Sequence, residues 1–438
     1  MPSEVFAPLQ KIIKRLKTSN FVRDVVMVGG GIAAGQAIAL IFMPFLTRLY
    51  GPEAFGIAAA FAAIVNIITP VATMGYANAI VMPESDDDAA AVARLSILCG
   101  FILAPVSLMA VHIGKPWLAV WTGMESAPHM LYLIPLTLII GAFLSVANQS
   151  AIRAGLFKAK ARAYVESKFL TDTSKLIGGI VAPSGLLLIL LTILGQLTNF
   201  VMQMLRVPRT GVLKVSNWFG TQGVRKAAIS QRDFAIYRMP QSVLRAFSVG
   251  LPVLMLTSLF GPESAGQYSI VLLLLSAPVM LLGDSVGEVF YPKITRAINN
   301  KTGNASILIS KAALVLFLVG IVPFGFIAFF GDIVLPWLFG DQWKVAGQYS
   351  QWVAFWMIAM LSVRPAIAAM PGLKMQSILL IYEIIITFGR VGALYIGSWN
   401  NSDILAIALF SIANVIGYLG LLLFVIVKSR ENSEAINV

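Results

Sequence analysis

Residues 49–56 read LYGPEAFG, and residues 259–266 give the same octet again as LFGPESAG. Prolines near the octets repeat as well, in three further pairs: Pro44 and Pro252, Pro70 and Pro278, and Pro83 and Pro292. Gly-Pro-Glu is ordinary turn chemistry by itself, but chance does not explain prolines that recur at nearly the same offset. The chain therefore contains an internal repeat of about half its length.

The composition identifies the environment in which the repeat folds. Of 438 residues, 58% are hydrophobic and only 12% are charged, and the mean hydropathy is +0.84. Soluble domains contain roughly 45–50% apolar and about 25% charged residues. The apolar runs are also continuous for about twenty residues, as helical spans require, whereas barrel strands alternate over about ten. These features predict an all-α polytopic membrane protein and exclude a soluble enzyme.

Apolar runs of sufficient length predict about twelve transmembrane helices. They cover 25–47, 55–81, 92–113, 129–152, 163–182, 186–207, 240–260, 266–291, 308–330, 346–371, 376–398 and 404–427. The division within 163–207 rests on a turn expected at Pro183, Ser184 and Gly185. Eleven spans are the alternative if that turn is absent.

The net charge of +12 follows membrane topology. Most of the 32 basic residues fall in alternate loops, which predicts that both termini are cytoplasmic. The basic stretch at 9–23 is either an amphipathic segment on the inner membrane surface or a solvated tail. It is not a cleaved signal peptide, because the apolar run that follows is too long. The charge therefore does not indicate a nucleic-acid partner.

Six spans in each half predict two like-oriented lobes, related by a pseudo-two-fold axis along the membrane normal, with a central cavity between them. The expected parts are an N-terminal lobe at 1–207, a cytoplasmic inter-lobe linker at 208–239 and a C-terminal lobe at 240–438. Such lobes usually alternate access to the cavity by rocking. Because every expected external loop is short, no segment is large enough for a catalytic domain.

Several motifs have simple structural interpretations. One cysteine, Cys99, and two histidines permit neither an internal disulfide nor a Cys/His metal cluster. Gly31 and Gly35 lie in an apolar span without a preceding strand, so we interpret them as close-packing residues and not as a dinucleotide loop. The acidic run at 86–88 is interpreted as the start of a helix, where carboxylates are favourable, in preference to a divalent cation site.

Charged residues inside the expected spans are the best candidates for a binding site, because each costs roughly 2.5–3.5 kcal/mol at the helix centre. The basic candidates for substrate binding are Arg390, Lys175, Arg364 and Arg48. The acidic candidates for ion coupling are Asp284, Glu288, Glu383 and Asp172. Arg390 lies near the middle of its span, with Glu383 two turns earlier on the same face. Arg364 either faces a cavity or extends to the interface, and Asp172 and Lys175 either bind a ligand or neutralise each other.

Two stretches resemble the polysaccharide (Wzx-type, O-antigen/exopolysaccharide) flippases of the multidrug/oligosaccharidyl-lipid/polysaccharide exporter superfamily. They are FLTRLYGPEAFGIAAAFAAIVNIITPVATMGYANAIVMPESDDDAA at 45–90 and RDFAIYRMPQSVLRAFSVGLPVLMLTSLFGPESAGQYSIVLLLLSAPVMLLGDSVGEVFYPKI at 232–294. Together they cover about a quarter of the chain. No short motif is diagnostic, but the second stretch is fairly specific as a whole.

The resemblance implies a bacterial inner-membrane protein that moves undecaprenyl-pyrophosphate-linked oligosaccharide units outward, with ion coupling and without a cofactor or covalent chemistry. The family is taken to line its cavity with cationic residues, which suits an anionic pyrophosphate. Other polysaccharide-assembly proteins are possible partners, and the oligomeric state is left open.

Two other functions remain open. A drug/cation antiporter of the same superfamily would use acidic or aromatic pocket residues, which the mixed charges here do not exclude. A membrane polysaccharide polymerase or ligase is the less favoured reading, because such enzymes need a substantial external loop carrying Arg or His. A peptidoglycan-precursor flippase belongs to the favoured class, and only substrate tests would separate it.

Overall fold

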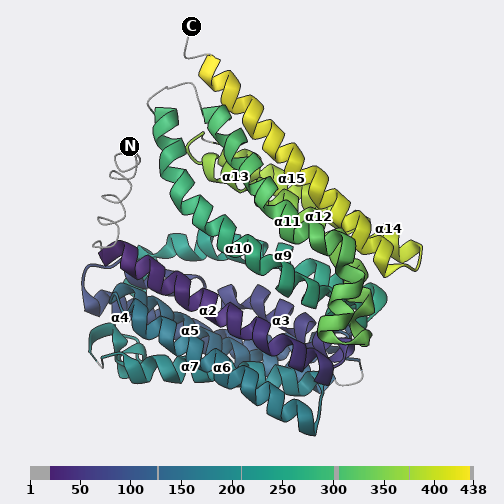
Figure 1. Ribbon diagram of the computed structural model, residues 1–438. Helices are drawn as coiled ribbons and strands as arrows, with labels where there is room; N and C mark the ends of the chain where they lie inside the picture. The colour runs from purple at the N-terminus through teal and green to yellow at the C-terminus, as the bar shows by residue number, and fades with distance from the viewer. Residues whose placement is uncertain (1–19, 126–127, 209, 300–304, 374, 435–438) are drawn as a thin grey trace, which may run out of the picture. The chain divides into compact units, whose positions relative to one another are not determined.

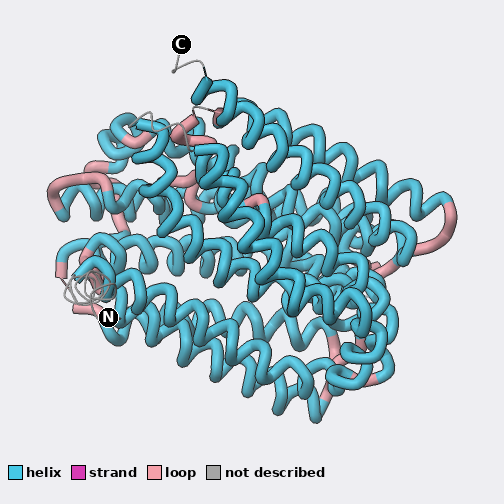
Figure 2. Tube along the Cα trace, turned by 45° about the horizontal axis from the view of Figure 1, so that its top comes forward, coloured by secondary structure: helices cyan, strands magenta, loops and turns pink. Residues whose placement is uncertain are grey.

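A computed structural model describes residues 20–125, 128–208, 210–299, 305–373 and 375–434. Within the helices, a minority of side chains lie outside this description, and two of them, Asp284 and Glu288, are predicted site residues. Every regular element in the described ranges is a helix (Figure 2). This confirms the predicted all-α class.

Among the described residues, ten helices or helical stretches are long and apolar enough to cross a membrane. They correspond to ten of the twelve expected spans. The expected spans at 163–182 and 266–291 are helical too, although they fall outside this set. The first contains four charged residues, and the second is described only in part. The chain is therefore a multi-pass membrane protein.

The chain divides into two compact units, which we describe separately. Unit 1 contains residues 1–49, 61–119 and 124–249, and unit 2 contains residues 50–60, 120–123 and 250–438. The helices α3 (Pro52–Ala72) and α9 (Met239–Phe260) contribute to both units. Helix α4 (Asp86–Thr122) lies in unit 1 except for its last residues, 120–122, which belong to unit 2.

Unit 1 is built mainly from long helices that lie alongside one another (Figure 1). Besides its parts of the shared helices, it contains α2 (Asn20–Leu49), α5 (Ile134–Arg153), α6 (Phe157–Val181), α7 (Gly185–Arg206) and the short α8 (Val224–Ser230). Its shorter turns are η1 (Tyr76–Val81), η2 (Pro128–Leu133), η3 (Gly211–Leu213), η4 (Val215–Trp218) and the π-helical η5 (Phe234–Arg238).

Unit 2 contains α10 (Pro262–Asn299), α11 (Ala305–Phe339), η6 (Asp341–Trp343), α12 (Lys344–Ser362), α13 (Arg364–Ala369), α14 (Gln376–Trp399) and α15 (Asp403–Glu434). The expected single span at 346–371 is broken between α12 and α13, where Pro365 follows the first residue of the new helix. The helices α4 and α11 are longer than the apolar runs expected at 92–113 and 308–330, because both extend beyond the run at each end and furthest at the C-terminal end.

The turn between the fifth and sixth expected spans forms where the sequence indicates it. Helix α6 ends at Val181 and α7 begins at Gly185. The Ser184 hydroxyl caps α7 by accepting a hydrogen bond from the Leu187 amide at 3.3 Å. Proline and an N-cap serine therefore separate two helices that hydropathy alone does not resolve.

Small residues bring α2 and α6 close together in unit 1. A Cβ atom added to Gly31 would lie 2.6 Å from the Ala161 Cβ atom, and one added to Gly35 would overlap the ring of Tyr164. Further along, Phe42 and Phe169 make an edge-to-face contact at 5.7 Å between centroids. The predicted packing role of the two glycines is confirmed.

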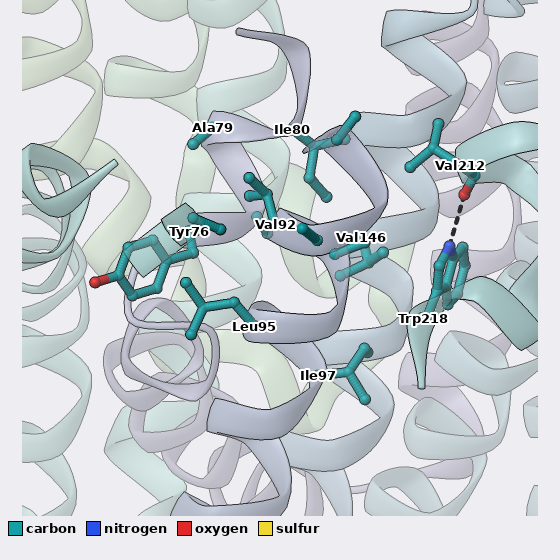
Figure 3. Packing of buried hydrophobic residues seen from close by; sticks show 14 of the residues in the cluster. Tyr76, Ala79, Ile80, Val92, Leu95, Ile97, Val146, Val212 and Trp218 are labelled. Carbon is teal, nitrogen blue, oxygen red and sulfur yellow. Dashed lines mark hydrogen bonds between the residues drawn. The ribbon is translucent and has the colours of Figure 1, made fainter. Parts of the chain in front are cut away.

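The expected linker at 208–239 is folded against unit 1. Trp218 in η4 is buried and donates its indole N–H to the Val212 carbonyl at 2.6 Å (Figure 3). The indole belongs to a hydrophobic core that includes Ile80, Val92 and Val146 from η1, α4 and α5. Most of this segment is thus anchored to one unit.

Candidate functional site

A buried arginine in unit 2 is held by three side chains on two neighbouring helices. The Arg390 guanidinium on α14 donates Nε–H to Asn414 Oδ1 at 2.9 Å and Nη1–H to Glu383 Oε1 at 3.1 Å. Its other terminal nitrogen, Nη2, lies 3.4 Å from Tyr418 Oη. Asn414 and Tyr418 are on α15, and Asn414 is fixed in turn by a bond from its amide to the Phe410 carbonyl at 2.8 Å. The network joins α14 to α15 at a charged centre.

The exposure of the two charged groups differs strongly. The Arg390 side chain is 9% exposed, whereas that of Glu383 is 38% exposed. A charge buried in an apolar span is tolerated when it is paired and its donors are satisfied. Here Glu383 supplies the opposite charge, while Asn414 and Tyr418 satisfy the remaining nitrogens. The structure therefore brings two of the predicted site residues, Arg390 and Glu383, into one ion pair.

Aromatic rings surround this network within unit 2. Tyr382 lies beside Tyr418 at 6.1 Å between centroids, and Trp356 makes an edge-to-face contact with Phe410 at 5.4 Å. Tyr268 on α10 packs against Phe410 from another side. Such rings exclude water and lower the local dielectric, which strengthens the ion pair and raises the cost of breaking it.

A second charged cluster lies on α6 in unit 1. Asp172 is 2% exposed, and Lys168 one turn earlier places its Nζ at 3.0 and 2.9 Å from the two carboxylate oxygens. Lys175, one turn beyond Asp172, is half-buried. Because residues three or four apart share a helix face, the three side chains line one face of α6. We call them the α6 cluster.

Two other predicted site residues, Arg48 and Arg364, lie near the ends of helices. Arg48 is exposed in the last turn of α2. Arg364 begins α13 and packs over Gly283 of α10, where a Cβ atom would lie 2.9 Å from its Nε. The side chains of Asp284 and Glu288 lie outside the described residues.

The acidic run at 86–88 forms the first turn of α4 as predicted, and its carboxylates diverge. Asp86 Oδ1 accepts a bond from Arg153 Nε at 3.2 Å, and Asp88 Oδ1 pairs with Lys226 at 2.9 Å. The Ser85 hydroxyl also caps the helix by accepting the Asp88 amide at 3.1 Å. In the described part of the chain, no three His, Cys, Asp or Glu side chains gather in a way that would hold a metal ion.

Three residues of the two clusters were not among the sequence candidates. Lys168 is not among the charged candidates, although its spacing of four from Asp172 is the signal for an ion pair on a helix. Asn414 and Tyr418 are uncharged, so a search for intramembrane charges passes over them. The sequence feature that could have identified them is their spacing, since two polar residues four apart lie on one face of an otherwise apolar span.

The chain is similar to known proteins in both sequence and fold. The family described as "Polysaccharide biosynthesis protein" matches residues 45–348. The chain is 22% identical over 398 residues to the "Succinoglycan biosynthesis transport protein ExoT" of Rhizobium meliloti (strain 1021), covering 87% of this chain and 75% of that protein.

Solved structures show the same fold. An inward-facing multidrug resistance MATE family transporter of the MOP superfamily matches with a TM-score of 0.69 at 15% identity, over 92% of this chain and 95% of the other. The lipid II flippase MurJ in an inward closed conformation matches with a TM-score of 0.68 at 12% identity, over 94% and 91% of the two chains.

Proposed function

This chain belongs to the polysaccharide biosynthesis protein family, and from that premise we propose that it flips undecaprenyl-pyrophosphate-linked oligosaccharide repeat units from the inner to the outer leaflet. The family match covers the two stretches of the flippase resemblance up to residue 294 and extends beyond them. This family match is the observation that supports a polysaccharide precursor as the class of substrate. The fold it shares with MOP-superfamily transporters supports alternating access as the mechanism.

The proposed setting is a bacterial inner membrane, with both termini cytoplasmic and with the two expected six-helix lobes rocking about a central cavity. The polyprenyl tail stays in the bilayer while the charged head and its sugars cross through the protein. No covalent step or prosthetic group is required. The free energy would come from an ion gradient, with Glu383 and Asp172 as the described carboxylates placed to take part.

Fixed cations at membrane depth support an anionic head group as the cargo. A pyrophosphate that leaves water needs compensating positive charge, since unpaired charge in the bilayer costs several kcal/mol. Arg390 on α14 and Lys175 on α6 are the two candidates for such a charge. Arg48 and Arg364 are further basic groups at helix ends, where they would meet the head group as it enters or leaves.

The decisive experiment is deletion of the gene in its native host, followed by assays of lipid-linked oligosaccharide in the membrane and polysaccharide at the surface. A flippase predicts accumulation of undecaprenyl-linked units and loss of surface polymer. Single repeat units at the surface without polymer would point to a polymerase. Altered drug sensitivity with normal polymer would instead favour a drug/cation antiporter; one of the similar solved structures is a multidrug resistance transporter.

A further inference from the structure

The internal repeat relates the two charged clusters to each other. The helices that carry them end at Val181 and Trp399, and the next helices begin at Gly185 and Asp403, so both pairs of boundaries are 218 residues apart. The same offset places Asp172 of α6 at the position of Arg390 in α14. Both are buried polar centres of their helices. The corresponding positions in the two halves of the repeat therefore carry opposite charges, Asp172 in α6 and Arg390 in α14.

The cluster in unit 2 is electrically complete. One guanidinium faces one carboxylate, and each guanidinium nitrogen lies within hydrogen-bond distance of Asn414, Glu383 or Tyr418. An added anion would have to displace Glu383 and leave that carboxylate without its partner in an apolar face. The exposed neighbours of Glu383 on α14 are Ile384 and Ile385. This arrangement favours an internal structural network over a substrate site.

The α6 cluster has a different balance of charge. Lys168 and Asp172 neutralise each other, and Lys175 brings the sum for the three side chains to plus one. The helices packed against α6 do not change this sum within their apolar parts. Beyond Gly29, α2 contains only Arg48 as a charged residue, and α5 and α7 contain only their terminal arginines, Arg153 and Arg206.

The cluster also faces the interior of unit 1. The opposite face of α6 exposes Ile177 and Ile180, as expected for a side directed at lipid. Lys168 nevertheless retains 28% of its side-chain exposure, so the inner face is reachable from solvent. A positive site at membrane depth with partial access is suited to an anion that crosses the bilayer.

We propose that the α6 cluster binds the phosphate groups of the transported head group, and that the Arg390 network of α14 is a structural counterpart that does not contact them. This assignment rests on the proposed function and selects one of its candidate anion sites. Asp172 has a defined part in it: the carboxylate competes with phosphate for Lys168. That competition keeps binding weak enough for release, as a transporter requires.

The test uses the purified full-length protein in detergent and measures binding of inorganic pyrophosphate and of farnesyl pyrophosphate by isothermal titration calorimetry. Lys175→Gln and Lys168→Gln should each weaken binding of farnesyl pyrophosphate at least tenfold, and Asp172→Asn should tighten it. The matched control is Lys158→Gln on the same helix, since Lys158 is exposed and lies on another face. The double variant Glu383→Gln/Arg390→Gln, which preserves neutrality, should bind like the wild type.

Each result is informative. Unchanged affinity in Lys175→Gln, or a large loss in the α14 double variant, would overturn the assignment. Equal affinity for both ligands would indicate a site for free pyrophosphate and contradict the assignment to a lipid head group.

Thermal unfolding of each variant identifies any that misfold, and Lys175→Arg should then restore binding by keeping the charge. Polymer export in a deletion strain separates the two proposals: a wild type that neither binds pyrophosphate nor restores export would refute the flippase itself.

Discussion

Gly56 lies with its Cα against the backbone carbonyl of Pro262, in a contact that leaves no room for a side chain. The internal repeat makes the reverse contact as well, since a Cβ atom on Gly266 would overlap the Pro52 carbonyl and lie 2.9 Å from the Gly56 amide. The first turns of α3 and α10 thus cross through the two copies of the octet, both within unit 2. The octets that reveal the repeat in the sequence are therefore in direct backbone contact within unit 2.

Gly56→Ala should therefore destabilise the protein. The methyl group would force two backbones apart, and overpacking of this kind costs about 1–3 kcal/mol. We expect a lower midpoint of thermal unfolding in detergent, with a similar loss for Gly266→Ala. Gly389→Ala is the matched control, because no heavy atom lies within 4 Å of its added Cβ in α14. Equal midpoints for Gly56→Ala and the control would show that the crossing is not tight in the folded protein.

Arg390→Gln should lower both stability and transport. Removing one partner of a buried pair costs about 3–5 kcal/mol, and we expect the lower end because Glu383 is 38% exposed. Glu383→Gln should also destabilise, by leaving the guanidinium without its carboxylate. The double variant should recover much of the lost stability, giving a coupling energy of about 1–3 kcal/mol in a double-mutant cycle. Additive effects of the two substitutions would show that the pair is not formed.

Hydropathy predicted the helical class and most of the spans, since continuous apolar runs and the prolines that interrupt them depend on local sequence. The turn at Pro183 and the packing role of Gly31 could be predicted from the sequence for that reason. Contacts between elements that are distant in the sequence could not be predicted in this way. The local sequence of the linker does not indicate that Trp218 is buried in unit 1, because a single aromatic residue in a polar stretch produces no hydrophobic periodicity.

The charged clusters show the same limit. Intramembrane charge singles out Arg390, Glu383, Asp172 and Lys175 in the sequence, but the partners of these side chains depend on how the helices are rotated against each other. Asn414 and Tyr418 contact Arg390 only because α15 packs beside α14. The break before Pro365 was missed because the run on both sides of it stays apolar, so hydropathy does not register the interruption.

Trp218→Ala should detach the linker from unit 1. Loss of a fully buried indole costs about 3–5 kcal/mol through the cavity it leaves, and the bond to the Val212 carbonyl is lost as well. We expect a lower thermal midpoint and faster proteolysis within 208–230. Phe219→Ala is the control, since the neighbouring ring is 50% exposed. If both variants are cleaved at the same rate, the linker is not anchored by Trp218.

Arg153 ties the loop before α4 to the end of α5, and its replacement should loosen that loop. Its guanidinium donates to the carbonyls of Pro83 and Glu84 as well as to Asp86, and its side chain is only 14% exposed. Hydrogen bonds from a charged donor contribute about 1.5–3 kcal/mol, so Arg153→Gln should lower the free energy of unfolding by about that amount. Lys in its place lacks the planar fork needed for several acceptors and should rescue little.

The exposed pair Asp88–Lys226 provides the contrast at the same end of unit 1. Lys226→Gln should cost less than about 1 kcal/mol, because its side chain is 75% exposed and water replaces the lost contact. Hydrogen exchange at residues 80–88 would then rise in Arg153→Gln and stay unchanged in Lys226→Gln. Equal protection in the two variants would mean that the helix cap at Ser85, and not the arginine, holds this loop in place.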